Sequence, residues 1–565
     1  MDSAQSSRVS GSRFHLLLIV LVGVVAMSPE LVLGATVSDS FRYNLLWPEQ
    51  VAALFREGHL YPRWLPHAWA GLGNPTFYFY PPLFFWVAAV IDAVTFGALT
   101  PERFTPLATL LVLAASGLTM RAWLSAHVAP RRALLGAFAY MVAPYHLYDI
   151  YARGALAEAA AYASVPLIAL ALTRLRAGRA LGLPLLAIGY GALLLMHLPS
   201  ALLVTVFLIA PYVVFEAVGA DRRVRFLVLA FAGGLLGIGL AAIYLVPAVG
   251  LLPYASADAL SASFYRPENW FFWHVNAGQF GGRMMLIIPI SIAALLLAGA
   301  SGLVAWRTSR EALFWPGLAA VLVIVIAGAI PPIWQLPALR LVQFPWRALV
   351  LVEFAAVTAV AVTAPPLRNP VVLAGAATLA LGYAVLAVLM VHVIGRTWSA
   401  QQRAAAEIRR DYADAPEYLP AGTKIVQGSG PAPEHIELPT LRNARATDPR
   451  AKVAATADTD GAMVVLVDSP VATEVVLPRF YFPHWRLRDR LGHAVPIAPT
   501  PAERLVSFPA PAGRASFRLS LGSAPYEGTG EMVSLVALLL LGAAVILTRA
   551  RFSGRPLPAG ENAIG

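Results

Sequence analysis

A carboxylate stands just beyond the first long apolar segment, which covers residues 14–34. Asp39 follows that segment by about one helical turn, so its side chain would lie near the headgroup layer of a membrane. A carboxylate at this depth can take a proton from an acceptor hydroxyl or hold a divalent cation. Asp is also a preferred helix N-cap, and residues 38–58 are expected to form a helix. Asp39 is therefore either a catalytic residue or a cap.

Three further charged residues fall within ten positions of one another: Asp149, Arg153 and Glu158. They lie in a short connection between two apolar segments, where an unpaired charge is costly and is usually functional. Asp149 and Arg153 are four residues apart, which is the spacing of an ion pair on one helix face. The alternative is that Asp149 approaches Asp39, so that two carboxylates frame a metal ion or an acceptor, while Arg153 holds a phosphate.

Hydrogen-bond donors recur at the ends of later apolar segments. His197, Gln343 and Arg347 stand at two such ends. Arg347 can bind a phosphate through two nitrogens while its stem stays in the apolar phase, or it can extend to lipid headgroups. His197 is either a substrate-binding residue or a packed one. A later polar loop contributes Tyr265 and Arg266, which predict a lid or an acceptor-binding loop.

The composition is that of a polytopic membrane protein. Of 565 residues, 58% are hydrophobic and only 13% are charged. The chain has no cysteine, which excludes disulfides, thiolate metal sites and cysteine nucleophiles. Its formal charge of +11 comes largely from short arginine clusters between apolar segments. Because the positive-inside rule explains such clusters as cytoplasmic loops, we expect no nucleic-acid partner.

Apolar segments that could cross a membrane recur along the chain. We expect crossings at 14–34, 104–126, 131–146, 156–173, 181–197, 199–219, 224–249, 285–306, 312–330, 343–364, 370–394 and 531–549. The segment 83–99 is also apolar, but its crossing would put the arginine-rich connection at 121–132 outside. We therefore expect 83–99 to lie in the membrane interface. The outer loops are then 35–103, 147–157, 250–284 and 331–343.

The segment 395–530 differs from the rest of the chain. It contains many prolines and short alternating runs such as AMVVLVD and ASFRLSL, which are typical of strands. We expect a small β-sandwich here, entered through a helix near 399–412. The chain then divides into a helical membrane domain, 1–394, a β-rich domain, 395–530, and a final membrane helix with a cytoplasmic tail, 531–565.

Six motifs in this chain resemble one family. They are EGHLYPRW followed by GLGNPTFYFYPPLFF, then APYHLYDIYARGALAE, HLPSALL, YLVPAV, LVQFPWRAL and FYFPHWRLRD. In this order they resemble the bacterial membrane proteins catalogued as 6-pyruvoyl-tetrahydropterin-synthase-related, and the layout is similar to that of the YfhO-like proteins. The histidine cluster that a soluble pterin enzyme needs is missing. The wider resemblance is to the GT-C glycosyltransferases, polytopic enzymes that use lipid-phosphate-linked sugars.

This resemblance implies a mostly α fold: a polytopic transmembrane helical GT-C-like domain with a C-terminal extracytoplasmic β-sandwich. By position, Asp39 matches the first-loop acid of the GT-C proteins, and Asp149 matches the second-loop acid. In related proteins a histidine often follows the first-loop aspartate by a few residues, but here Phe41, Arg42 and Tyr43 occupy that stretch. A histidine-assisted role for Asp39 is therefore not expected.

The expected function is sugar transfer in a bacterial cytoplasmic (inner) membrane, with the active face outside. The donor would be a polyprenyl-phosphate-linked sugar, with its phosphate on Arg347 and Arg153, and Asp39 would act as the general base. The acceptor could be a glycan, a lipid or a protein, and a divalent cation could take part. The alternatives are a transporter or flippase of a lipid-linked saccharide, which should have charged or broken helices near the midplane, and a non-enzymatic scaffold.

Overall fold

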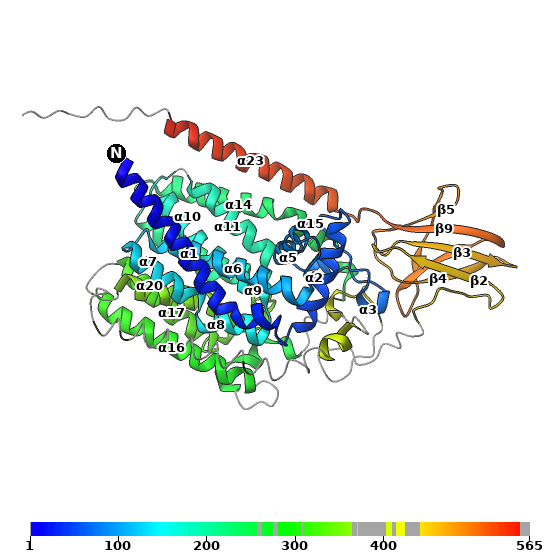
Figure 1. The fold of residues 1–565 in the computed structure, drawn as a ribbon, viewed down its shortest axis with the longest axis horizontal. Coiled ribbons are helices and arrows are strands. Elements are labelled where there is room, and N and C mark those ends of the chain that lie inside the picture. The colour runs from blue at the N-terminus through cyan, green and yellow to red at the C-terminus, as the bar shows by residue number, and fades with distance from the viewer. Residues whose placement is uncertain are drawn as a thin grey trace, which may run out of the picture.

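The computed structural model describes most of the chain. The described residues are 2–179, 181–256, 263–274, 281–306, 310–363, 403–409, 414–423 and 441–553, with the single positions 370, 374 and 392. A helical body forms one part of the molecule, and a β domain projects from one end of it (Figure 1). The N-terminus and the C-terminal part of the last helix lie at the opposite end, away from the strands (Figure 1).

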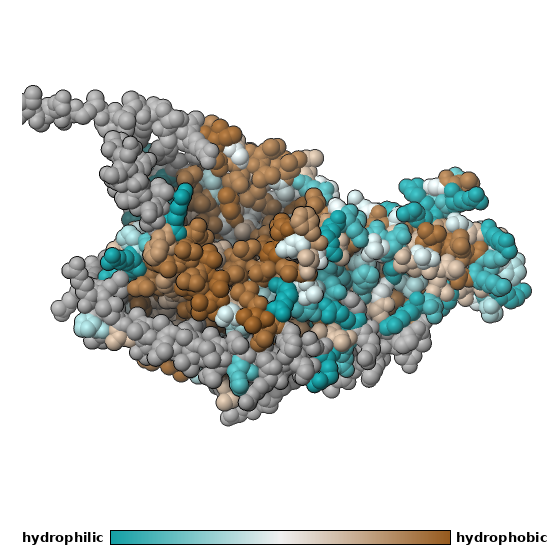
Figure 2. All heavy atoms as spheres, in the orientation of Figure 1, coloured by the Kyte–Doolittle hydropathy of each residue, from teal (hydrophilic) through white to brown (hydrophobic). Residues whose placement is uncertain are grey.

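Eight helical stretches in the described part of the chain are long and apolar enough to cross a membrane, which indicates a membrane protein. They are α1 (Asp2–Leu33), α6 (Pro101–Leu124), α9 with α10 (Leu156–Ala161, Ser164–Arg176), α12 with η2 and α13 (Leu198–Val204, Thr205–Ile209, Ala210–Val218), α14 (Arg223–Leu240), α16 (Gly281–Ala305), η9 with α20 (Pro345–Ala348, Leu349–Thr363) and α23 (Glu527–Ser553). Figure 2 shows hydrophobic residues gathered over the helical body and hydrophilic ones over the β domain.

Of the twelve predicted crossings, eight correspond to the stretches above and three to shorter helices. They are α7 (Pro130–Met141, 12 residues), α11 (Gly182–Met196, 15 residues) and α17 (Arg310–Ile326, 17 residues). At about 1.5 Å per residue they measure roughly 18–26 Å, less than the ~30 Å of a hydrocarbon core. The predicted segment 224–249 is broken at Ala241 into α14 and α15 (Ala242–Gly250). The predicted crossing at 370–394 lies almost entirely outside the described residues.

Residues 35–103, predicted as the first outer loop and called so below, contain four helices before α6: α2 (Phe41–Arg56), α3 (Ala68–Gly71), α4 (Thr76–Phe79) and α5 (Leu83–Val94). With 12 residues, α5 measures only about 18 Å, in agreement with the prediction that this segment does not cross the membrane. It packs on α2 through Trp47 and Phe85, whose ring centroids are 5.6 Å apart. An ion pair between Arg56 and Asp92 joins the same two helices.

The strands form two antiparallel sheets, which confirms the predicted β-rich region. One sheet has the order β1-β4-β8-β7 and the other β2-β3-β9-β5-β6. The strands are β1 (Arg445–Ala446), β2 (Lys452–Ala457), β3 (Met463–Ser469), β4 (Thr473–Phe480), β5 (Trp485–Asp489), β6 (Ala494–Val495), β7 (Ala498–Pro499), β8 (Leu505–Ala510) and β9 (Gly513–Leu521). Alternate residues of β3 are buried, and Phe508 meets Phe517 of the other sheet with ring centroids 4.8 Å apart. The sheets therefore enclose a common apolar core.

The β domain rests directly on the first outer loop. Trp64 of that loop packs against His484 and Trp485, with ring centroids 4.7 and 5.4 Å away. Backbone bonding continues the contact, since the amide of Phe480 donates to the carbonyl of Leu72 at 2.8 Å. The predicted helix near 399–412 is present over 403–409, and among the described residues of this segment the first strand begins at Arg445.

Asp414 ties a second segment to the same loop. Its buried carboxylate accepts hydrogen bonds from Trp47 Nε1 at 2.6 Å, Asn74 Nδ2 at 2.9 Å and Thr76 Oγ1 at 2.6 Å. Residues 414–423 also pair with the chain just after η3 (Leu252–Tyr254), through a β-bridge between Ala255 and Pro420. This segment therefore holds the loops around the candidate site in place.

Candidate functional site

Two outer loops meet through backbone hydrogen bonds. The amide of Asp39 donates to the carbonyl of Ala152 at 3.1 Å, and the amide of Ser40 donates to that of Arg153 at 2.9 Å. The π-helical turn η1 (Asp149–Arg153) ends at Gly154, whose φ is +62°. A Cβ at Gly154 would stand 2.1 Å from the hydroxyl of Ser38. The close approach of the two loops thus depends on a glycine at this position.

Asp39 is exposed and is paired with an arginine. Its Oδ2 accepts from Arg283 of α16, at 2.8 Å from Nη2 and 3.0 Å from Nε. The N-cap of α2 is Ser40, and no side chain caps that helix. The alternative interpretation of Asp39 as a helix cap is therefore wrong. Its second oxygen, Oδ1, makes no hydrogen bond within the described residues, and the side chain is 47% exposed.

Glu158 is the centre of a buried charged cluster. It stands in the first turn of α9 with no exposed surface. Its Oε2 lies 3.0 Å from Arg153 Nη1 and 3.1 Å from Arg347 Nε, and its Oε1 accepts from the hydroxyl of Tyr145 at 2.7 Å. The structure thus brings Arg153 and Arg347, which are 194 positions apart in the chain, to one carboxylate.

Asp149 belongs to the same cluster. Its Oδ1 pairs with Arg153 Nη1 at 2.5 Å, so the four-residue spacing does form an ion pair. Its Oδ2 is buried and has no hydrogen-bond partner in the described part of the chain. Burial, and then the nearby charge of Glu158, raise the pKa of Asp149 well above its ordinary value. The cluster thus holds two arginines and two carboxylates, and its arginines are the groups suited to an anionic ligand.

Arg347 lies at the start of the helical stretch η9–α20, in the interior of the protein. Its Nη1 donates to the carbonyl of Val342 at 2.7 Å and to Gln343 Oε1 at 3.3 Å, and its guanidinium lies over the ring of Phe344. Gln343 has a φ of +68°, a strained value for a residue other than glycine. Because Arg347 binds Glu158, the alternative that it extends to lipid headgroups is wrong. The contacts within the described residues leave its Nη2 without a partner.

Two other predicted residues border the cluster. His197 is a packed N-cap of α12: its Nδ1 bonds the hydroxyl of Ser200 at 2.8 Å, and its Nε2 lies 4.0 Å from Glu158. Tyr265, in η5 (Ser263–Tyr265), lies against Phe344 with ring centroids 6.1 Å apart. Arg266 is exposed and makes no side-chain hydrogen bond or ion pair with the cluster within the described residues.

Tyr148 links Asp39 to the cluster. It is largely buried, and burial raises the pKa of its hydroxyl. The charges that act on this hydroxyl include Arg153 and Asp149 from the cluster, and Asp39 with Arg283 from the exposed pair. One tyrosine therefore lies within the electrostatic reach of both groups. Asp39 and the buried cluster form adjoining parts of one site.

Glu417 is a candidate that the sequence did not suggest. It lies in η10 (Pro416–Tyr418), inside the segment that Asp414 anchors. Partial burial raises the pKa of Glu417 to about 7, and burial followed by the charge of Glu417 raises the pKa of Tyr43 and Tyr265. Tyr418, the neighbour of Glu417, lies against Phe79 and Tyr80 of the first outer loop, with ring centroids 6.2 and 6.5 Å away. A glutamate in the proline-rich run DAPEYLP has no signal by which it could be recognised in advance.

The acidic residues do not fit a metal site as they stand. Asp39 and Asp149 each bind an arginine, and Asp149 is fully buried, so the prediction that these two carboxylates frame a metal ion is not met. Within the described ranges, no group of three or more histidine, aspartate or glutamate side chains is arranged to hold a metal ion.

Comparison with known proteins adds no family to this description. No protein-family model matches the chain. No curated protein matches it either.

Proposed function

We propose that this protein transfers a sugar from a polyprenyl-phosphate donor to an acceptor on the outer face of a bacterial cytoplasmic membrane. The body would be GT-C-like, and the β domain would be extracytoplasmic. One observation carries the proposal: Glu158 holds Arg153 and Arg347 beside a loop that presents the exposed carboxylate of Asp39. A phosphate-binding group and a proton acceptor thus adjoin at one end of the apolar helices.

The chemistry needs few groups. The acceptor oxygen attacks the anomeric carbon, its proton passes to Asp39 Oδ1, and the bond from that carbon to the phosphate oxygen breaks with its electrons on the phosphate. A single displacement of this kind inverts the anomeric carbon. A phosphate is a weak base, so the two arginines of the cluster stabilise it without a general acid.

A transporter of a lipid-linked saccharide is the second candidate. The observation that favours it is the π-helical turn η2, which interrupts the apolar stretch Leu198–Val218. Such turns often mark functional positions in helices, and transporters bind substrate at interrupted helices. The charged cluster lies at a helix start rather than in mid-span, which favours the transferase.

Asp39→Asn tests the proposed base. The amide keeps the shape of the side chain but cannot take a proton at neutral pH, so we expect transfer to fall at least 100-fold while lipid-phosphate binding stays near the wild-type level. The assay follows a radiolabelled polyprenyl-phosphate sugar in proteoliposomes, beside a binding measurement on the same preparation. Wild-type transfer by Asp39→Asn would remove Asp39 from the mechanism.

Arg347→Ala is the matched test of binding. It removes the unpartnered Nη2, while Glu158 keeps Arg153 and Tyr145. Loss of a charge-assisted contact at a partly desolvated site costs on the order of 2–5 kcal/mol, so we expect binding to weaken by tenfold or more. Arg490→Ala, at an exposed position of the β domain, is the control. If no sugar is transferred but labelled lipid crosses the bilayer, the protein is a transporter.

A further inference from the structure

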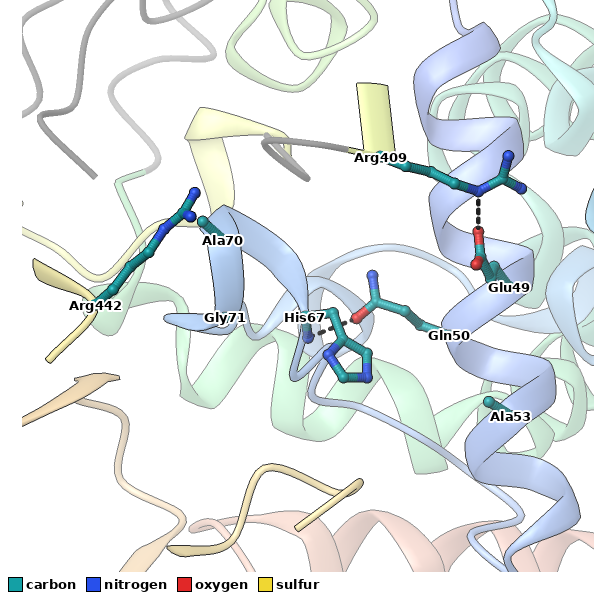
Figure 3. Close-up of a pocket in the computed structure, with 8 residues that line it drawn as sticks. All are labelled: Glu49, Gln50, Ala53, His67, Ala70, Gly71, Arg409 and Arg442. Atoms are coloured by element: carbon teal, nitrogen blue, oxygen red, sulfur yellow. Dashed lines mark hydrogen bonds and ion pairs between the residues drawn. The ribbon is translucent and has the colours of Figure 1, made fainter. Parts of the chain in front are cut away.

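A second site opens on the first outer loop. It is a pocket of about 420 Å³, within the range of small-molecule sites. Three segments that are distant in the sequence form it: the middle of α2, the turn at α3, and the chain that leads into the β domain. Its lining residues are Glu49, Gln50, Ala53, His67, Ala70, Gly71, Arg409 and Arg442 (Figure 3). Glu49 lies on α2, the helix that follows Asp39 in the chain.

The polar wall of the pocket is held in place by its own hydrogen bonds. Glu49 accepts from Arg409 Nε at 3.2 Å, and Arg409 Nη1 donates to Glu102 at 3.0 Å. Gln50 is buried, and its Oε1 accepts from the amide of His67 at 2.9 Å. Figure 3 shows Glu49 and Arg409 on one side of the pocket and Arg442 on the other, with Gln50 and His67 between them. A wall ordered in this way loses little conformational freedom when a ligand binds.

The floor of the pocket has an unusual backbone. Trp69, Ala70 and Gly71 are three consecutive residues with positive φ, at +53°, +55° and +93°. Such a conformation costs free energy in the first two, and it persists where the surroundings enforce it, often at ligand sites. The side chain of Trp69 is buried, and Arg479 donates to the carbonyl of Gly71. The small side chains at the floor leave the volume open.

The charges of the wall indicate the kind of ligand. Arg409 is neutralised by two glutamates, whereas Arg442 is exposed and has no ion pair within the described residues. Burial and the charge of Arg479 lower the pKa of His67, so its ring is neutral near pH 7 and can both donate and accept. A carboxylate, an amide and a neutral imidazole suit hydroxyl groups, and a guanidinium suits a carboxylate or a phosphate.

We propose that this pocket binds a sugar unit that carries a negative charge, with the hydroxyls on Glu49, Gln50 and His67 and the anionic group on Arg442. The inference rests on the proposed function, in which this unit belongs to the acceptor, away from its reacting end. Under this proposal the acceptor of the transferred sugar is an acidic glycan.

The test measures binding directly, with the full chain in lipid nanodiscs. The probes are glucuronate and glucose, which differ in the acidic group, and the readout is saturation-transfer NMR with a titration. We expect glucuronate to bind at least tenfold more tightly than glucose. Arg442→Gln should remove this preference, and Ala53→Phe, which fills the pocket, should abolish binding of both. Arg490→Gln removes one exposed arginine of the same domain and should change nothing.

The two proposals fail in distinguishable ways. Two results would refute sugar binding in the pocket. One is equal binding of glucuronate by the wild type, Arg442→Gln and Ala53→Phe; the other is no binding by the wild type at tens of millimolar glucuronate. Binding that follows the expected pattern in a protein that transfers no sugar would keep the pocket and reject the transferase.

Discussion

At the scale of single residues, one glutamate decides what the site can do. An arginine near a membrane surface ordinarily extends to water or lipid. Here Arg153 and Arg347 turn inward, because Glu158 offers both of them a buried carboxylate. Two arginines shared by one acid keep part of their donor capacity. In the proposed function, two arginines held in this way bind a phosphate within an apolar body without an isolated buried charge.

Part of this site could be predicted from the sequence. Asp149, Arg153 and Glu158 stand within ten residues of a chain in which charge is rare, and Arg347 begins an apolar segment. Their convergence on Glu158 could not be predicted, since it depends on how distant helices pack. The pairing of Asp39 with Arg283, 244 residues away, is of the same kind.

Glu417 makes a prediction about pH. Burial raises its folded-state pKa to about 7, above the ordinary 4.5, so the folded protein favours the protonated carboxyl. The stabilisation from this group is complete below about pH 4.5 and is lost as pH rises through 7. We expect Glu417→Gln to raise the melting temperature relative to wild type at pH 8 and to make little difference at pH 5.

Thermal unfolding in detergent at both pH values measures this effect. Glu474→Gln, at an exposed position of β4, is the control and should show no such pH dependence. An equal shift at pH 5 and pH 8 for Glu417→Gln would contradict the assignment.

At the scale of elements, the turn after η1 fixes the distance between the two outer loops. Gly154 needs a positive φ, and a Cβ there would lie 2.1 Å from Ser38 Oγ and 2.7 Å from Asn44 Nδ2. We expect Gly154→Ala to destabilise the fold by more than about 1 kcal/mol and to reduce transfer, because Asp39 would move away from the cluster. The measurements are the melting temperature and the proteoliposome assay.

Gly178 supplies a matched control for this substitution. Its φ of +67° is similar, but no atom lies within 4 Å of an added Cβ. Gly178→Ala should therefore show the backbone strain without the steric conflict, and it should leave transfer unchanged. Equal losses of transfer in the two variants would show that the contact with Ser38 does not position the loop.

The helices show where sequence reasoning reaches its limit. Each predicted apolar segment that lies within the described residues does contain a helix. Hydropathy predicts these helices because lipid-facing and packed surfaces both need apolar side chains. The lengths of the helices were less predictable. The helix expected over 131–146 ends at Met141, shortly before Pro144, and the one expected over 224–249 breaks at Ala241. Such ends depend on local turns that hydropathy does not register.

At the scale of the whole molecule, the β domain is a cover for the first outer loop. The apolar surface of the helical body and the hydrophilic surface of the β domain divide the protein into two environments (Figure 2). Trp64 and Asp414 join them, since the first packs on His484 and the second binds three side chains of the loop. The pocket lies in the part that joins the two, because α2, α3 and the chain that leads into the β domain line it.

Orientation in the membrane gives the last prediction. The arginine clusters predict that residues 221–225 are cytoplasmic, whereas Ser40 and the β domain are outside. Because the chain has no native thiol, single cysteines can be labelled without background. In intact spheroplasts, a membrane-impermeant maleimide should label Ser40→Cys and Arg514→Cys, and it should label Arg222→Cys only after permeabilisation. The hydrogen bonds between the loops require position 40 and the cluster to lie on the same side of the membrane. Labelling of position 40 from the cytoplasm would therefore mean that the whole site is cytoplasmic. A polyprenyl-phosphate sugar presented at the outer face could then not reach Asp39, and the proposed transfer would have to occur at the cytoplasmic face.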